Sequence, residues 1–245
     1  MNTNAVYTKK VKRKYLVNEW LIYSMIGPHP RIVQCLNTNL YDLPADSRIE
    51  VAGKEPIRLA LAPNGDLASY MAAHPANPQP MRAKWGAQIA EGITFIHSRK
   101  IMWGDCSPKN ILLDANLDAI LCDFAGSALP GIGNSCAPPF RYTNPDIDFG
   151  FNFSGNRKID TFGFGCVFLE ILTWTPEASD QGWVPNVHRR GLSFDRQRLL
   201  IDTVIFAPFK EIVENCWDNK YEDGGQLFAA VSAAWETFEQ FEGST

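Results

Sequence analysis

The stretch from Ile159 to Leu172 constrains the fold most strongly, because it is almost wholly apolar. A helix on the surface of a globular protein carries a continuous polar face, and this stretch has none. The sequence therefore predicts a helix that is buried on all sides. Further helical patterns run from Gly191 to the end of the chain, which predicts a mainly helical C-terminal part.

The composition is that of an ordinary globular protein. Apolar residues make up 45% of the 245 residues and the formal net charge is −4, which excludes intrinsic disorder and argues against nucleic acid as a partner. No run of about 18 apolar residues occurs, and no apolar segment follows the basic N-terminus, so we expect neither a membrane span nor a secretory signal. The six cysteines are scattered without a C-x-x-C pair. They predict reduced core thiols and a cytoplasmic location, with the nucleus as the alternative.

The pattern of apolar residues and turns divides the chain into a small N-terminal part, residues 1–62, and a helical part, residues 63–245. Ala62-Pro63-Asn64-Gly65 is the turn between them. Residues 126–158 are rich in Gly, Pro, Ser and Asn and predict a long irregular segment, which is usually functional in a compact domain. The other expected elements include strands at 5–12, 32–40 and 50–61 and a hairpin of 111–113 and 119–122. Helices are expected at 15–26, where Gly27-Pro28 stops the helix, and at 67–73. A further, long helix carries Trp85, Ile89, Ile93 and Ile96 on one face.

The segment W-G-D-C-S-P-K-N-I-L-L-D carries the chemistry. Asp105 and Asn110 lie five residues apart in its loop, and Asp123 follows the predicted hairpin. Two carboxylates and an amide on adjacent loops suit phosphoryl transfer: one acid accepts the hydroxyl proton, while the amide and the other acid hold magnesium on the phosphates. The alternative is that all three are turn or capping residues. The order and spacing of the whole set favour the chemical interpretation.

These motifs resemble the eukaryotic protein kinases, in particular fungal kinase-like and tyrosine-kinase-like members. W-G-D-C-S-P-K-N is similar to H-R-D-x-x-x-x-N, and D-F-A-G to D-F-G. Residues 141–146 look like the A-P-E region, 158–165 like the buried helix whose aspartate supports the catalytic loop, and 215–217 like a late Cys-Trp pair. The resemblance implies an α+β, bilobal fold over 1–245 as a single domain, with a small, shortened, β-rich N-lobe and a larger, mainly α-helical C-lobe.

The resemblance also implies roles for single residues, with ATP and Mg²⁺ as cofactors. Asp105 would be the catalytic base, and Asn110 and Asp123 the magnesium ligands. Lys109 would supply a cation beside the base, or is a solvated loop lysine. Asp66 would reach the ribose or cap a helix, and the cap is favoured. For the adenine, Leu59 would be the gatekeeper, Ala60 and Ala62 would offer backbone groups, and Leu112 would form the floor.

The chain departs from the family pattern near its start. No G-x-G-x-x-G precedes Glu19, the expected helix glutamate, so the resemblance implies a truncated N-lobe and low activity. Lys9 is the expected lysine partner of Glu19. The alternatives place Thr8 at that position, or leave Lys9 on a solvated basic face. Ala125 replaces the flexible glycine of D-F-G.

Three functions remain open. The first is a protein kinase that transfers phosphate from ATP and Mg²⁺ to a serine, threonine or tyrosine hydroxyl of a protein substrate. The second is a pseudokinase that acts as a nucleotide-binding or scaffold module for a regulatory partner. A small-molecule phosphotransferase is less favoured, because the segment 126–146 and the helix after Lys158 are typical of protein kinases. No zinc site is expected, because no His and Cys cluster occurs.

Overall fold

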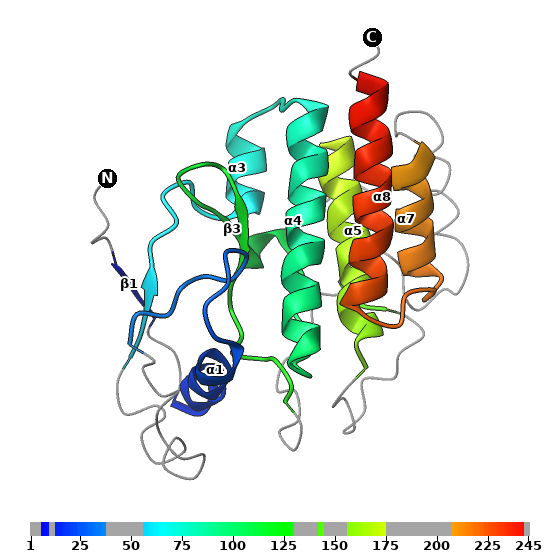
Figure 1. The fold of residues 1–245 in the computed structure, drawn as a ribbon. Helices are drawn as coiled ribbons and strands as arrows, with labels where there is room; N and C mark the ends of the chain where they lie inside the picture. Colours follow the sequence, from blue (N-terminus) through cyan, green and yellow to red (C-terminus); the bar gives the residue numbers. More distant parts are fainter. Residues whose placement is uncertain are drawn as a thin grey trace.

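The computed structural model describes residues 6–9, 13–37, 56–129, 142–144, 156–174 and 207–242. These residues form a small N-terminal part with a two-stranded sheet and one helix, and a larger, mainly helical C-terminal part (Figure 1). The expected α+β, bilobal architecture is confirmed. The irregular segment predicted at 126–158 and the helical pattern that begins at Gly191 lie mostly or partly outside the described residues.

The N-terminal part is built from β1 (Val6–Lys9), α1 (Arg13–Ile26) and β2 (Ile57–Ala60). The two strands pair antiparallel, with Tyr7 opposite Leu59 and Lys9 opposite Ile57. Helix α1 ends before Gly27, whose φ of 76° is a conformation that glycine adopts readily. The predicted helix stop at Gly27-Pro28 is therefore confirmed.

The strand predicted at 32–40 is wrong for its described residues, 32–37. They form two isolated bridges, Ile32 with Leu121 and Cys35 with Leu59. The backbone here divides its hydrogen bonds between two partners: Val33 N donates to Leu121 O (2.9 Å), whereas Leu36 N donates to Arg58 O (2.7 Å). This segment therefore ties β2 to the C-terminal part and does not extend the sheet as a regular strand. Residues 38–40, and 50–55 of the strand predicted at 50–61, lie outside the described residues.

The C-terminal part contains α3 (Leu67–Ala73), α4 (Gln79–Ser98), α5 (Lys158–Thr173), α7 (Ala207–Trp217) and α8 (Gly224–Glu242), with the hairpin β3 (Ile111–Leu113) and β4 (Ala119–Leu121). Helix α5 packs against α4 and α7, and α8 lies along α4 (Figure 1). The buried residues of α5 run without interruption from Ile159 to Leu172, as predicted. The four apolar residues predicted for one face of α4 are also fully buried.

Two further predictions concern the described residues. The five described cysteines form no disulfide with one another, and four of them are buried, which fits reduced core thiols. No helix within the described ranges is long and apolar enough to cross a bilayer.

Gly163 allows α5 to approach the loop that carries Asp105. A Cβ at this position would lie 2.8 Å from the Cβ of Cys106, which follows Asp105 directly. We expect Gly163→Ala to destabilise the protein by about 1–3 kcal/mol, because a close-packed core cannot take up the extra methyl without shifting. Urea denaturation would measure this change. Ala230→Gly, a change at a partly buried residue of α8, is the control for helix propensity, with an expected loss of about 1 kcal/mol. Unchanged stability in Gly163→Ala would contradict the close approach.

Candidate active site

Asp160 of α5 anchors the loop from Trp103 to Asn110 through hydrogen bonds to its backbone. The side chain of Asp160 is fully buried and accepts hydrogen bonds from Trp103 N and Gly104 N, both at 2.7 Å. His97 Nε2 of α4 lies 2.9 Å from the same carboxylate. Three groups, two from the loop and one from α4, thus share one buried carboxylate. This anchor sets the position of Asp105, the next residue along the chain.

Asp105 carries a half-buried carboxylate, one oxygen of which lacks a hydrogen-bond partner in the described part of the chain. Within the described residues, its Oδ1 is buried and has no hydrogen-bond partner. Burial raises the pKa of Asp105 to about 6, and the carboxylates of Asp123 and Asp160 add to this increase, whereas Asn110 and Lys9 oppose it. A carboxylate with a pKa near 6 is suited to accept a proton at neutral pH.

Two hydrogen bonds bring the predicted magnesium ligands, Asn110 and Asp123, close to Asp105. Asn110 Nδ2 donates to the backbone oxygen of Asp105 (2.9 Å), which holds the amide beside the base. Cys122 N donates to Asn110 O (2.9 Å), which places Asp123 next to Asn110 at the end of β4. The side chain of Asp123 is 40% exposed. The three residues therefore meet where the loop and the hairpin adjoin.

Lys9 of β1 reaches this site from the N-terminal part. Its Nζ lies 2.8 Å from Glu19 Oε2 of α1 and 2.7 Å from Asp123 Oδ1. Burial acts to lower the pKa of Lys9, but the two carboxylates outweigh it and the pKa is raised. Burial raises the pKa of Glu19, which Lys9 partly offsets. The lysine is buried and paired, so it does not lie on the solvated face that the sequence left open. Thr8 points to the other face of the sheet.

The structure divides the residues predicted to hold adenine between the sheet face of Lys9, the strand β3 and a separate cavity. Leu59 is 5% exposed and faces the same side of the sheet as Lys9. Leu112 is half-buried on β3. Ala60 and Ala62 line a separate cavity of about 620 Å³, together with Asp114 and Ile120. That cavity is not lined by Lys9, Asp105 or Asp123, so it is distinct from the site that these residues form.

The structure places two further predicted residues without assigning them a ligand. Asp66 accepts hydrogen bonds from Ser69 N (2.8 Å) and Ser69 Oγ (2.7 Å), so the predicted cap of α3 is confirmed. Lys109 is exposed on the short 3₁₀ helix Pro108–Asn110, next to Asn110. Its role as a cation beside the base stays a prediction.

Sequence reasoning missed Tyr7. It lies two residues before Lys9 on β1, and alternation along a strand puts both side chains on one face. Leu59, directly opposite, is 5% exposed, whereas Tyr7 is 52% exposed. An aromatic ring on the face that carries Lys9 thus remains open to solvent. Side chains alternate along a strand, so the spacing of two residues between Tyr7 and Lys9 was the signal that could have identified Tyr7.

Three of the known proteins to which this chain is similar in sequence are kinases. A probable serine/threonine-protein kinase of Dictyostelium discoideum is 31% identical over 114 residues, which cover 44% of this chain and 27% of that protein. The serine/threonine-protein kinase PKH2 of Saccharomyces cerevisiae is 26% identical over 192 residues, 72% of this chain and 18% of that protein. Wall-associated receptor kinase-like 15 of Arabidopsis thaliana is 28% identical over 218 residues, 82% of this chain and 31% of that protein.

The chain spans about a fifth to a third of the length of these relatives. The family model described as protein kinase domain matches residues 3–218, which is most of the chain. The chain therefore belongs to the protein kinase domain family.

Proposed function

We propose that this chain transfers the γ-phosphate of ATP, with Mg²⁺, to a hydroxyl group of a protein substrate. The observation that carries the proposal is the meeting of Asp105, Asn110 and Asp123 on two adjacent loops. Two of the relatives above are named serine/threonine kinases, which favours serine or threonine over tyrosine as acceptor. In this proposal residues 1–245 act as one domain whose lobes meet near residue 62.

Each side chain has a distinct part in this chemistry. Asp105 accepts the proton of the attacking hydroxyl on its carboxylate. Asn110 and Asp123 offer oxygen ligands, which Mg²⁺ prefers. When bound, the metal neutralises charge on the phosphates. Lys9 holds phosphate oxygens and is itself oriented by Glu19.

The donor set fits Mg²⁺ better than a metal held by protein alone. The described residues contain no group of three or more His, Cys, Asp or Glu that could hold an ion. Mg²⁺ is usually bound by one or two carboxylates and completed by phosphates and water. The site therefore implies a metal that arrives with the nucleotide.

A pseudokinase is the second candidate, and one contact favours it. Lys9 Nζ lies 2.7 Å from Asp123 Oδ1, so the lysine competes with the metal for this ligand oxygen. A thermal-shift titration with ATP, with and without Mg²⁺, separates the two. The kinase proposal expects Mg²⁺ to increase the ATP-induced shift, and expects Asp123→Asn to remove the increase. An ATP shift that ignores Mg²⁺ would favour the pseudokinase.

The acceptor is tested by offering the protein two kinds of hydroxyl. We expect labelled γ-phosphate to appear on a library of serine and threonine peptides, and not on choline or an aminoglycoside. Phosphorylation of the small alcohols, with none of the peptides, would overturn the protein acceptor and favour a small-molecule phosphotransferase.

Tyr7 is expected to strengthen nucleotide binding through its exposed ring. Stacking of a base on an aromatic side chain contributes roughly 1–3 kcal/mol, so Tyr7→Ala should weaken ATP binding by about tenfold. Isothermal titration of both proteins measures the change. Thr8→Ala is the matched control, because Thr8 is the adjacent exposed residue on the opposite face. Equal affinities in wild type and Tyr7→Ala would place the base elsewhere.

A further inference from the structure

Asn18, the residue before Glu19, joins α1 to the turn that follows Asp123. Its Nδ2 donates to Ala125 O and to Ser127 O, both at 2.9 Å. The partners lie more than a hundred residues away in sequence and on the other part of the molecule. The side chain is buried, with 8% of its surface exposed.

The orientation of this amide follows from its partners. Both partners are carbonyl oxygens, which accept hydrogen bonds, so the nitrogen of Asn18 must face them. Its Oδ1 is buried and has no partner among the described residues. A buried acceptor without a partner is costly. The side chain of Asn18 therefore stabilises the fold through the two hydrogen bonds that its nitrogen donates, although its buried oxygen has no partner among the described residues.

The turn held by Asn18 begins at a residue in an unusual conformation. Asp123 has a φ of 56°, in the left-handed region that residues other than glycine rarely adopt. The turn is closed by Ser127 N, which donates to Phe124 O (3.1 Å), and Ala125 N lies 3.3 Å from Asp123 Oδ1. Glu19 Oε1 accepts from Phe124 N at 3.3 Å. Adjacent residues of α1, Asn18 and Glu19, thus bind the backbone at three residues after Asp123.

We propose that Asn18 is a positioning residue, which keeps the Asp123 carboxylate in the conformation that binds the metal. The inference rests on the proposed function, because it assigns Asp123 to the metal. Lys9 holds the carboxylate through an ion pair, whereas Asn18 holds the backbone through two hydrogen bonds. Without these bonds the strained φ of Asp123 is free to relax, and the carboxylate leaves Asn110.

The first measurement follows the backbone and needs no ligand. Hydrogen exchange read by mass spectrometry compares the peptide around residues 122–128 in wild type and in Asn18→Leu, which keeps the volume but removes the donor. We expect at least tenfold faster exchange of these amides in the variant. Ser24→Ala is the matched control, because Ser24 is a buried polar residue of the same helix that bonds within it, to Leu21 O at 2.6 Å. Its exchange in this peptide should equal that of wild type.

The second measurement follows the metal. We expect Asn18→Leu to require about tenfold more Mg²⁺ for half of the ATP-induced thermal shift, while Ser24→Ala requires the wild-type amount. Asn18→Ser, which keeps a hydroxyl donor, should recover part of the loss and serves if Asn18→Leu does not fold. Since ATP binding without Mg²⁺ is recorded in the same series, a general loss of folding is separated from a loss of metal affinity.

The outcomes separate this inference from the function on which it rests. Unchanged exchange, or faster exchange with an unchanged Mg²⁺ requirement, would overturn the role of Asn18 alone. Wild-type protein that shows no Mg²⁺ dependence would refute the proposed function and, with it, the metal part of this inference. In that case the exchange data would still report whether Asn18 holds the turn.

Discussion

Replacing Lys9 with methionine is expected to destabilise the protein by about 3 kcal/mol, because the change leaves a buried charge without its partner. Glu19 is fully buried and lies 2.8 Å from Lys9. A carboxylate in this position either stays ionised at a high cost or takes up a proton. Urea denaturation at pH 7 measures the loss. ATP binding should weaken in the same variant, because Lys9 is the cation proposed to hold the phosphates.

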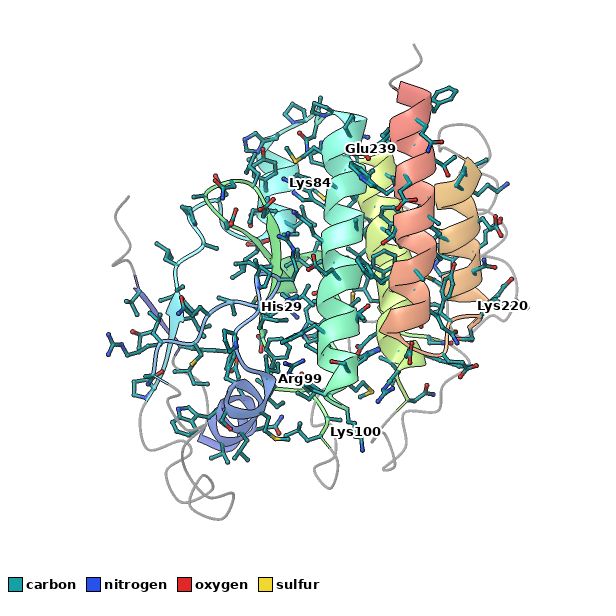
Figure 2. All side chains as sticks on the ribbon, viewed as in Figure 1. His29, Lys84, Arg99, Lys100, Lys220 and Glu239 are labelled. Atoms are coloured by element: carbon teal, nitrogen blue, oxygen red, sulfur yellow. The ribbon has the colours of Figure 1, made fainter. Side chains whose placement is uncertain are left out.

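Two further variants separate stability from function at this position. Lys84→Met removes a lysine that lies 2.6 Å from Asp118 but is 40% exposed on α4 (Figure 2), and surface pairs contribute at most about 1 kcal/mol. The double change Lys9→Met with Glu19→Leu removes both buried charges and should recover most of the stability. It should not recover ATP binding. Equal losses in Lys9→Met and Lys84→Met would contradict the buried pair.

Asp105→Asn is expected to change stability and activity in opposite directions. The pKa of Asp105 is raised from 3.8 to about 6 by burial, so the folded state holds this proton more tightly than the unfolded chain. Stability from this group is therefore present below about pH 4 and is lost as the pH rises through 6. At pH 7 asparagine removes the cost of the buried charge. The gain is on the order of 1–2 kcal/mol, because a pKa unit is about 1.4 kcal/mol and the side chain is partly exposed.

Phosphoryl transfer should fall at least about a hundredfold in Asp105→Asn, because the general base is gone, while ATP binding stays near wild type. Thermal melts at pH 4 and pH 7 test the stability change, which should be present at pH 7 and small at pH 4. Glu239→Gln removes a carboxylate from the exposed face of α8 and should leave both properties unchanged (Figure 2). A loss of stability in Asp105→Asn at pH 7 would contradict the burial of this carboxylate and its raised pKa.

Local patterns were sufficient for much of the fold. The buried helix α5, the hairpin of β3 and β4, the cap at Asp66 and the stop at Gly27 each depend on residues close in sequence, and each was predicted. The strand at 32–40 was not, because residues 32–37 divide their backbone hydrogen bonds between the hairpin and β2. A pattern of apolar residues contains no information about which partner each backbone group finds.

In the candidate site, too, the features that depend on residues close in sequence could be predicted, and those that depend on distant partners could not. The spacing of Asp105, Asn110 and Asp123 was visible in the sequence, and their proximity follows from the hairpin between them. Lys9 could not be separated from a solvated lysine or from Thr8, because its burial depends on Glu19 and Asp123, which other elements supply. Asn18 gave no signal, since its partners are backbone carbonyls that any residue carries.

The most direct test of the proposed function is transfer of labelled γ-phosphate from ATP to serine and threonine peptides by the purified chain, with Asp105→Asn prepared in parallel. We expect incorporation that requires Mg²⁺ in the wild type, and at least about a hundredfold less in the variant. Transfer that is equal in both preparations would come from a contaminating kinase. Equal transfer, or none from wild-type protein that binds ATP, would contradict phosphoryl transfer by this site and leave a nucleotide-binding pseudokinase.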